Sequence, residues 1–183
     1  MENKRFTTQH CGDVVVTKYT NHRDVRVRFV DTGTSIRTSK RALTNTDRPR
    51  LRDPKAPTVF GIGRIGIGHH KAHEGSADTQ PFRIWRAMLR RCYYGPEATA
   101  WREGYTVAEV WHDFQVFADW FEENYPRDGG SYQLDKDTIA LGNKVYGPAV
   151  CTFITQQENL AARRFKRDRG RPTATGTAPP SSE

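Results

Sequence analysis

Apolar and polar residues alternate through the first part of the chain. Two runs show the pattern, Val14 to Val16 and Val25 to Phe29, and residues typical of turns separate them. An alternation with a period of two predicts strands with one buried face. Arg26 and Arg28 fall on the opposite, polar face of the second run. We therefore predict a small, basic antiparallel β domain over residues 1–43, with three or more strands.

A helical period replaces the alternation after Pro81, a residue suited to the first turn of a helix. Apolar residues then recur at intervals of three and four, at Ile84, Trp85, Met88, Leu89 and Cys92. A second stripe of this kind contains Trp111, Phe114, Phe117 and Phe121. These patterns predict one helix that ends before Gly95 and another from about Glu109 to Asn124. We interpret the aromatic stripe of the second helix as part of a core and not as a surface for base stacking.

Residues 44–78 have neither period. This segment contains three prolines and two Gly-Ile-Gly steps, at 61–63 and 66–68, and no helical pattern follows the glycines. A glycine-rich phosphate loop leads into a helix, so we interpret the segment as a linker or exposed loop. Arg48, Arg50 and Arg52 alternate along its extended first part, where they are candidates for contacts with a nucleic-acid backbone.

The pattern of the last structured segment predicts a strand, a loop, a second strand and a helix. The predicted strands are Tyr132 to Asp137 and Val150 to Ile154, and Thr155 with Glu158 forms a capping box for the helix. This order brings the end of the first strand towards the first turns of the helix, with Asp135 beside Asn159. One carboxylate and one amide oxygen suit Mg²⁺ completed by water and phosphate oxygens.

Charge adds a partner class to this picture. Residues 1–60 hold 13 lysines and arginines against 6 acidic residues, residues 61–160 hold 10 against 13, and residues 161–183 hold 6 against 2. Two basic flanks suit a polyanion: DNA, with RNA as an open alternative. Three cysteines form no even framework, and no apolar run is long enough to cross a membrane. We expect a cytoplasmic protein without a membrane partner and with a disordered tail over 169–183.

Residues 82–167 resemble phage proteins identified as HNH endonucleases or HNH-like DNA-binding proteins. The resemblance rests on three groups: Trp85, Met88, Arg91, Cys92 and Tyr93; then Trp111, Phe114, Phe117 and Trp120; then Asp135, Lys136, Gly142, Asn143, Tyr146, Pro148, Cys151 and Phe153. It implies a ββα-metal unit within 79–168, with Asp135 and Asn159 at the metal-ligand positions and Asn143 bracing the loop. Lys136 stands where active enzymes of the family carry the histidine that deprotonates water.

The predicted fold class is therefore α+β, with a β unit, two aromatic helices and an HNH-like end. A lysine is protonated at neutral pH and is a poor base, whereas it binds phosphate well. We expect a DNA-binding protein descended from an HNH nuclease. Further contacts with the nucleic acid are expected from Lys144, Arg163, Arg164 and Lys166. An active Mg²⁺-dependent endonuclease and a phage inhibitor of a host protein are the alternatives.

Histidines leave two further possibilities open. His112 is a candidate for the missing base if it folds over the site. His70 and His73 have a spacing that could serve Zn²⁺, but no third and fourth ligand follow them at finger-like spacing. A solvated loop is the simpler interpretation of the cluster that also contains His69. Cys92 and Cys151 are interpreted as small buried hydrophobic residues.

Overall fold

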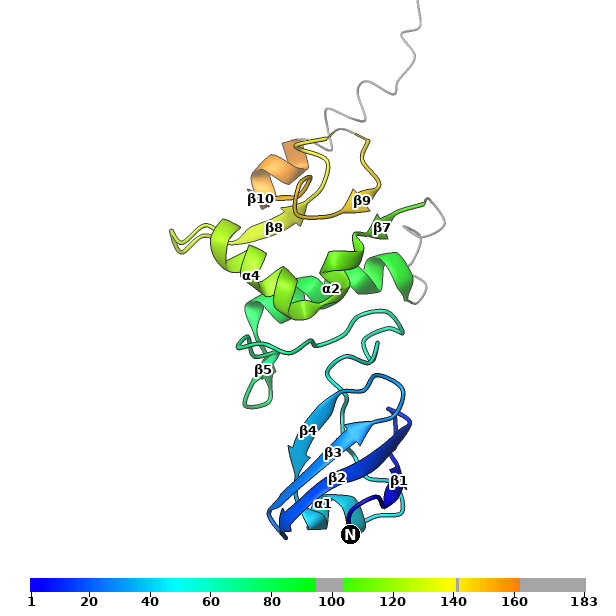
Figure 1. Ribbon diagram of the computed structural model, residues 1–183. Coiled ribbons are helices and arrows are strands. Elements are labelled where there is room, and N and C mark those ends of the chain that lie inside the picture. The colour runs from blue at the N-terminus through cyan, green and yellow to red at the C-terminus, as the bar shows by residue number, and fades with distance from the viewer. Residues whose placement is uncertain (95–103, 141, 162–183) are drawn as a thin grey trace, which may run out of the picture.

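The computed structural model describes residues 1–94, 104–140 and 142–161. The chain is a mixture of helices and small, mostly antiparallel sheets, which confirms the α+β class. In Figure 1 the N-terminal sheet lies at one end of the molecule, two helices cross its middle and a hairpin with a short helix forms the other end. Two separate hydrophobic cores correspond to this division, one on the N-terminal sheet and one around the helices.

The N-terminal sheet contains four antiparallel strands in chain order. They are β1 (Arg5–Thr7), β2 (Asp13–Asn21), β3 (Asp24–Phe29) and β4 (Ser35–Thr38). The alternating residues of β2 and β3 are fully buried on one face. Helix α1 (Lys40–Thr44), capped by the Ser39 hydroxyl, contributes Leu43 to the same core, and Leu51 adds to it. The predicted β unit is confirmed.

The two predicted helices are present and share one aromatic core. Helix α2 spans Gln80–Tyr93 with a proline in its first turn, and α4 spans Phe114–Asn124. A 3₁₀ turn, η1 (Glu109–His112), precedes α4, because the Asp113 side chain accepts the Gln115 N–H and begins a new helix there. The indole N–H of Trp85 donates to the Trp111 carbonyl at 2.6 Å and links α2 to this turn.

The prediction of a linker or exposed loop over 44–78 is wrong for its glycine-rich part. A Cβ at Gly63 would meet Trp85 at 2.8 Å, one at Gly66 would meet Asp113 at 2.1 Å, and one at Gly68 would meet Gln115 at 2.2 Å. These glycines let the segment pack directly on α2 and α4. A two-stranded ribbon follows, formed by β5 (His73–Glu74) and β6 (Ala77–Asp78).

The C-terminal unit consists of a hairpin followed by a helix. The hairpin pairs β8 (Tyr132–Asp135) with β10 (Thr152–Thr155), and residues 156–161 are helical. Its connecting loop contains β9 (Val145–Tyr146), which pairs in parallel with β7 (Thr106–Val107) and so ties the loop to the helical core. Phe153 of β10 packs against Trp120 and Tyr125. The predicted strand, loop, strand and helix order is confirmed.

Among the described residues, none of the helices combines the length and apolar character needed to cross a bilayer.

Candidate functional site

A row of three cationic side chains crosses the outer face of the N-terminal sheet. Lys18 of β2 lies opposite Arg26 of β3, and Arg26 lies opposite Arg37 of β4. All three residues are exposed. Lys18 reaches this face because β2 has a bulge at Thr17, where the pairing skips one residue between Val16 and Lys18. Simple alternation would have pointed Lys18 into the core with Val16.

Two more arginines extend this surface, which we call the basic face. Arg28 lies opposite Val15, whose other neighbour is Arg5. The basic face thus consists of Arg5, Lys18, Arg26, Arg28 and Arg37. Arg5 pairs with Asp13 at 3.6 Å and Arg37 with Asp24 at 3.1 Å. Lys18, Arg26 and Arg28 have no ion-pair partner within the described part of the chain, so their charges face solvent.

The second set of predicted DNA contacts lies on a different side of the domain. Arg48, Arg50 and Arg52 are exposed, and they alternate with buried residues of the same segment, including Leu51. Leu51 belongs to the core beneath the inner face of the sheet, so the arginines between these buried residues point away from that core. The structure does not join this set to the basic face, because the core lies between them.

The C-terminal helix begins as predicted. The Glu158 carboxylate accepts the Thr155 backbone N–H at 2.7 Å, and the Glu158 N–H donates to the Thr155 hydroxyl at 3.2 Å. These are the two reciprocal bonds of a capping box. The Thr155 hydroxyl also donates to this carboxylate, at 2.8 Å, and the Thr155 N–H together with this hydroxyl holds the pKa of Glu158 below its ordinary value, because both donors favour the charged form.

The two predicted metal ligands, Asp135 and Asn159, each make hydrogen bonds to other groups of the C-terminal unit. The Asn159 amide donates to the Gln133 side chain at 2.6 Å. Asp135 lies two residues beyond Gln133 in β8, a Cα spacing of about 6.6 Å along the strand. One Asp135 oxygen accepts two backbone N–H groups, from Asp137 at 2.9 Å and Thr138 at 2.6 Å. This carboxylate closes the turn after β8. No contact among the described residues joins Asp135 to Asn159, so a Mg²⁺ ion held jointly by the two stays a prediction.

Lys136 lies inside the loop and not on its surface. Its side chain is 8% exposed, and its ammonium contacts the Asp137 carboxylate at 2.7 Å and the Asn143 carbonyl at 2.8 Å. The Tyr105 ring lies 4.2 Å from the same nitrogen. The prediction that Lys136 offers its charge to a phosphate at the surface is therefore wrong. A cation enclosed at this position also disfavours a metal ion beside it.

Asn143 bridges the two sides of the loop that joins the hairpin strands. Its amide nitrogen donates to the carbonyls of Val145, at 2.6 Å, and Lys136, at 3.4 Å, and its oxygen accepts the Val145 N–H. These contacts are those expected of a loop brace. Lys144 next to it is exposed, and its carbonyl accepts the Thr106 N–H where β9 meets β7.

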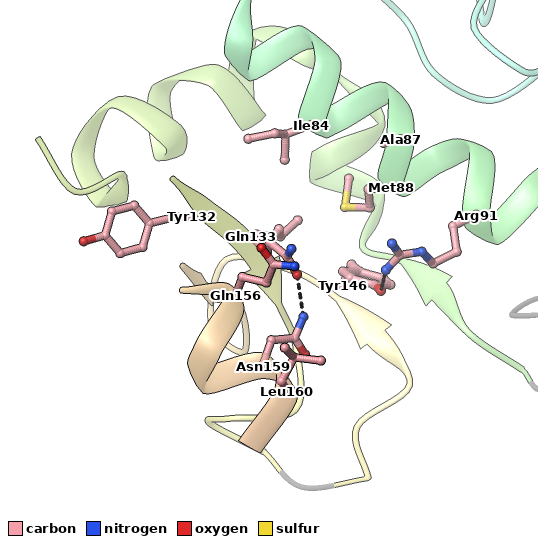
Figure 2. A pocket seen from close by; sticks show the side chains of 11 residues that line it. Ile84, Ala87, Met88, Arg91, Tyr132, Gln133, Tyr146, Gln156, Asn159 and Leu160 are labelled. Atoms are coloured by element: carbon pink, nitrogen blue, oxygen red, sulfur yellow. Dashed lines mark hydrogen bonds between the residues drawn. The ribbon is translucent and has the colours of Figure 1, made fainter. Parts of the chain in front are cut away.

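A pocket of about 440 Å³ lies between α2 and the hairpin, beside the predicted metal position. Figure 2 shows Asn159 and Gln133 joined at one side of it and Arg91 of α2 donating to the Tyr146 hydroxyl at another, at 3.0 Å. Burial raises the pKa of Tyr146, so its hydroxyl stays neutral. Amide groups and apolar side chains dominate the lining, and none of the described residues that line the pocket carries a carboxylate.

The histidines take positions that the sequence did not indicate. His73 pairs with Asp78 across the ribbon at 2.9 Å, so it does not join His70 in a zinc site as considered above. His112 contacts the Val107 carbonyl at 3.1 Å and lies edge-on to Tyr93. Burial lowers its pKa. No described contact brings His112 to Asp135 or Asn159.

The cysteines are structural. Cys92 and Cys151 are buried, and burial raises the pKa of each thiol to about 11. Neutral thiols inside a core are poor metal ligands. Their predicted role as small hydrophobic residues is confirmed.

Arg163, Arg164 and Lys166, predicted to contact nucleic acid, lie outside the described residues, as does the tail over 169–183. The HNH resemblance rests on sequence motifs. A scan against protein-family models, a search of curated proteins and a search of solved structures each found no match to this chain.

Proposed function

We propose that this protein binds double-stranded DNA through the basic face of its N-terminal sheet and does not cleave it. The observation that carries the proposal is the row of Lys18, Arg26 and Arg37 across three neighbouring strands. This row spans about 10 Å, twice the spacing of adjacent strands.

Electrostatics support a polyanionic partner for this row. Like charges directly opposite one another on a sheet are destabilising. The row sets Lys18 against Arg26 and Arg26 against Arg37, and only Arg37 has an acidic partner in the described residues. A phosphate backbone laid along the face would neutralise these cations and release the counterions that surround DNA. Contacts of this kind position the protein on the duplex without reading its sequence.

The C-terminal unit supports the second half of the proposal. Its order of strand, loop, strand and helix agrees with the HNH resemblance, but the position of the catalytic base holds a buried Lys136 that is paired with Asp137. Metal-assisted cleavage of a phosphodiester requires an activated water and a bound ion. The contacts of Asp135 and Asn159 favour neither, so the alternative of an active nuclease gains no support from the geometry.

The test uses the full chain and a fluorescent 20-base-pair DNA duplex, an illustrative length of about two helical turns. We expect the affinity to fall steeply as salt rises, with a slope of log K against log[salt] near −0.9 for each phosphate neutralised. A duplex of RNA and a single strand are the competitors. Plasmid DNA should stay uncut with Mg²⁺ or Mn²⁺. An absent or salt-independent interaction would reject the binding function, and nicking that depends on Asp135 would reject the loss of cleavage.

A truncated chain ending at residue 161 provides the second arm of this test. The removed residues hold 6 lysines and arginines against 2 acidic residues. If the tail and the basic face both contact phosphates, truncation reduces the salt slope without abolishing binding. Complete loss of binding on truncation would assign the interaction to the tail and reject the role of the sheet.

A further inference from the structure

Three side chains able to bind a metal converge where the glycine-rich segment meets α4. They are His69, His70 and Asp119, and their ligand atoms all lie within 4.8 Å of one another. We propose that they form a binding site for a divalent transition-metal ion of the Zn²⁺ type. This site is independent of the proposed DNA interaction and of the Asp135 and Asn159 positions.

The donor set indicates the class of ion. Two imidazoles and one carboxylate suit Zn²⁺, Co²⁺ and Ni²⁺, whereas Mg²⁺ and Ca²⁺ prefer oxygen ligands alone. Three protein ligands also leave room for water to complete the coordination. The histidines are adjacent in sequence and the aspartate follows 49 residues after His70, so only the folded chain assembles the set.

The distances are close to those of a coordinated ion. The Nε2 atom of His70 lies 2.8 Å from the Asp119 carboxylate. Two ligands of one Zn²⁺ ion, each about 2.0 to 2.1 Å from the metal, lie about 2.9 to 3.4 Å apart. The His69 ring lies beside that of His70, with 3.9 Å between their centroids. His69 and Asp119 are exposed, so the small movements that complete the site are unhindered by packing.

His70 is fixed before any ion arrives. Its side chain is 7% exposed. The buried Gln115 side chain accepts the His70 backbone N–H at 3.0 Å and donates to the His70 carbonyl at 3.1 Å. Gly68 allows this approach, because a Cβ there would occupy the position of the Gln115 side chain. A ligand held in place in this way loses little conformational entropy on binding.

A second carboxylate lies near the other ring nitrogen of His70. The Nδ1 atom of His70 lies 3.5 Å from the Glu122 carboxylate, one helical turn beyond Asp119. Ligating histidines commonly direct their other nitrogen at a carboxylate, which orients the ring and strengthens its basicity. Glu122 is therefore assigned as a positioning residue. A bound ion would fasten the glycine-rich segment to α4.

The experiment is a calorimetric titration of the full chain, without an affinity tag, with Zn²⁺ in metal-free buffer, followed by Co²⁺ and its visible absorption bands. We expect one ion per chain. Because His69 and Asp119 are exposed, His69→Ala and Asp119→Ala should fold normally by circular dichroism and weaken binding at least tenfold. Glu122→Gln should weaken it about tenfold without changing the stoichiometry.

His73→Ala is the matched control, since His73 is a nearby histidine that pairs with Asp78. It should bind Zn²⁺ as the wild type does. At one fixed Zn²⁺ concentration, the ion should also raise the thermal midpoint of the wild type and of this control, and raise those of His69→Ala and Asp119→Ala by less. Absence of binding, or binding weakened equally by His73→Ala, would overturn the site. The cluster would then be only the hydrogen bond between His70 and Asp119.

Discussion

The ammonium of Lys136 lies 2.7 Å from the carboxylate of Asp137, its neighbour in the chain, within the loop that follows β8. The same ammonium lies over the Tyr105 ring and donates a hydrogen bond to the Asn143 carbonyl. Lys136 thus has a structural role at the position where the HNH resemblance implies a catalytic base. Because a structural lysine occupies the position of the catalytic histidine, we propose that the unit keeps its fold and has lost cleavage.

Removal of the Lys136 side chain should destabilise the fold. Lys136→Ala removes a buried ammonium that contacts the Asp137 carboxylate and the Asn143 carbonyl, which we expect to cost about 3 kcal/mol of unfolding free energy. The control is Lys144→Ala in the same loop, where the residue is exposed and the cost should stay below about 1 kcal/mol. Urea denaturation measures both. If both substitutions lower the free energy of unfolding by the same amount, the buried pair contributes no more to stability than an exposed lysine.

A methyl group at Gly63 should disturb the aromatic core. Its Cβ would lie 2.5 Å from Leu89 and 2.8 Å from Trp85, both fully buried, so we expect Gly63→Ala to cost about 1 to 3 kcal/mol. Gly61→Ala meets no atom within 4 Å but has a φ of +75°, and should cost about 1 to 2 kcal/mol from backbone strain alone.

Near-ultraviolet circular dichroism separates the two mechanisms behind these glycine substitutions. Only Gly63→Ala should alter the tryptophan signals, because only this methyl group contacts Trp85. An unchanged spectrum and unchanged stability for Gly63→Ala would contradict the packing described here.

The capping box should make the C-terminal helix sensitive to acid. The pKa of Glu158 is lowered from an ordinary value of 4.5, first by the Thr155 backbone N–H and then by its hydroxyl. A lowered pKa means that the contribution to stability is complete above about pH 5 and is lost as the pH falls through the folded-state pKa. Wild type should therefore lose helical signal below pH 4.5 relative to Glu158→Gln, which does not titrate at this position. A constant difference between the two from about pH 6 to about pH 3 would contradict this account.

Local patterns predicted the elements well. The alternation around Val14 and Val25, the proline that begins α2 and the Thr155 cap each act within a few residues, so the sequence displays them directly. The break before α4 was missed because Asp113 caps a helix inside a continuous aromatic stripe.

Contacts between distant residues were not predictable in this way. The bulge at Thr17 shifts Lys18 to the outer face by one residue, which alternation alone does not reveal. The glycine repeat resembled a flexible loop, because the side chains that leave room only for glycine there, Trp85 and Gln115, belong to other elements. Asp135 resembled a metal ligand in sequence, but its carboxylate caps the turn that follows it.

The central claim, that the basic face binds DNA, is tested most directly by comparing two triple variants of equal charge change. One carries Lys18→Gln, Arg26→Gln and Arg28→Gln, and the other carries Arg48→Gln, Arg50→Gln and Arg52→Gln. All six residues are exposed, so both variants should fold. The measurement is the slope of log K against log[salt] for duplex binding. We predict a slope shallower by about 3 for the first variant and by less than about 1 for the second. An unchanged slope in the first variant, or the reverse order, would contradict the claim.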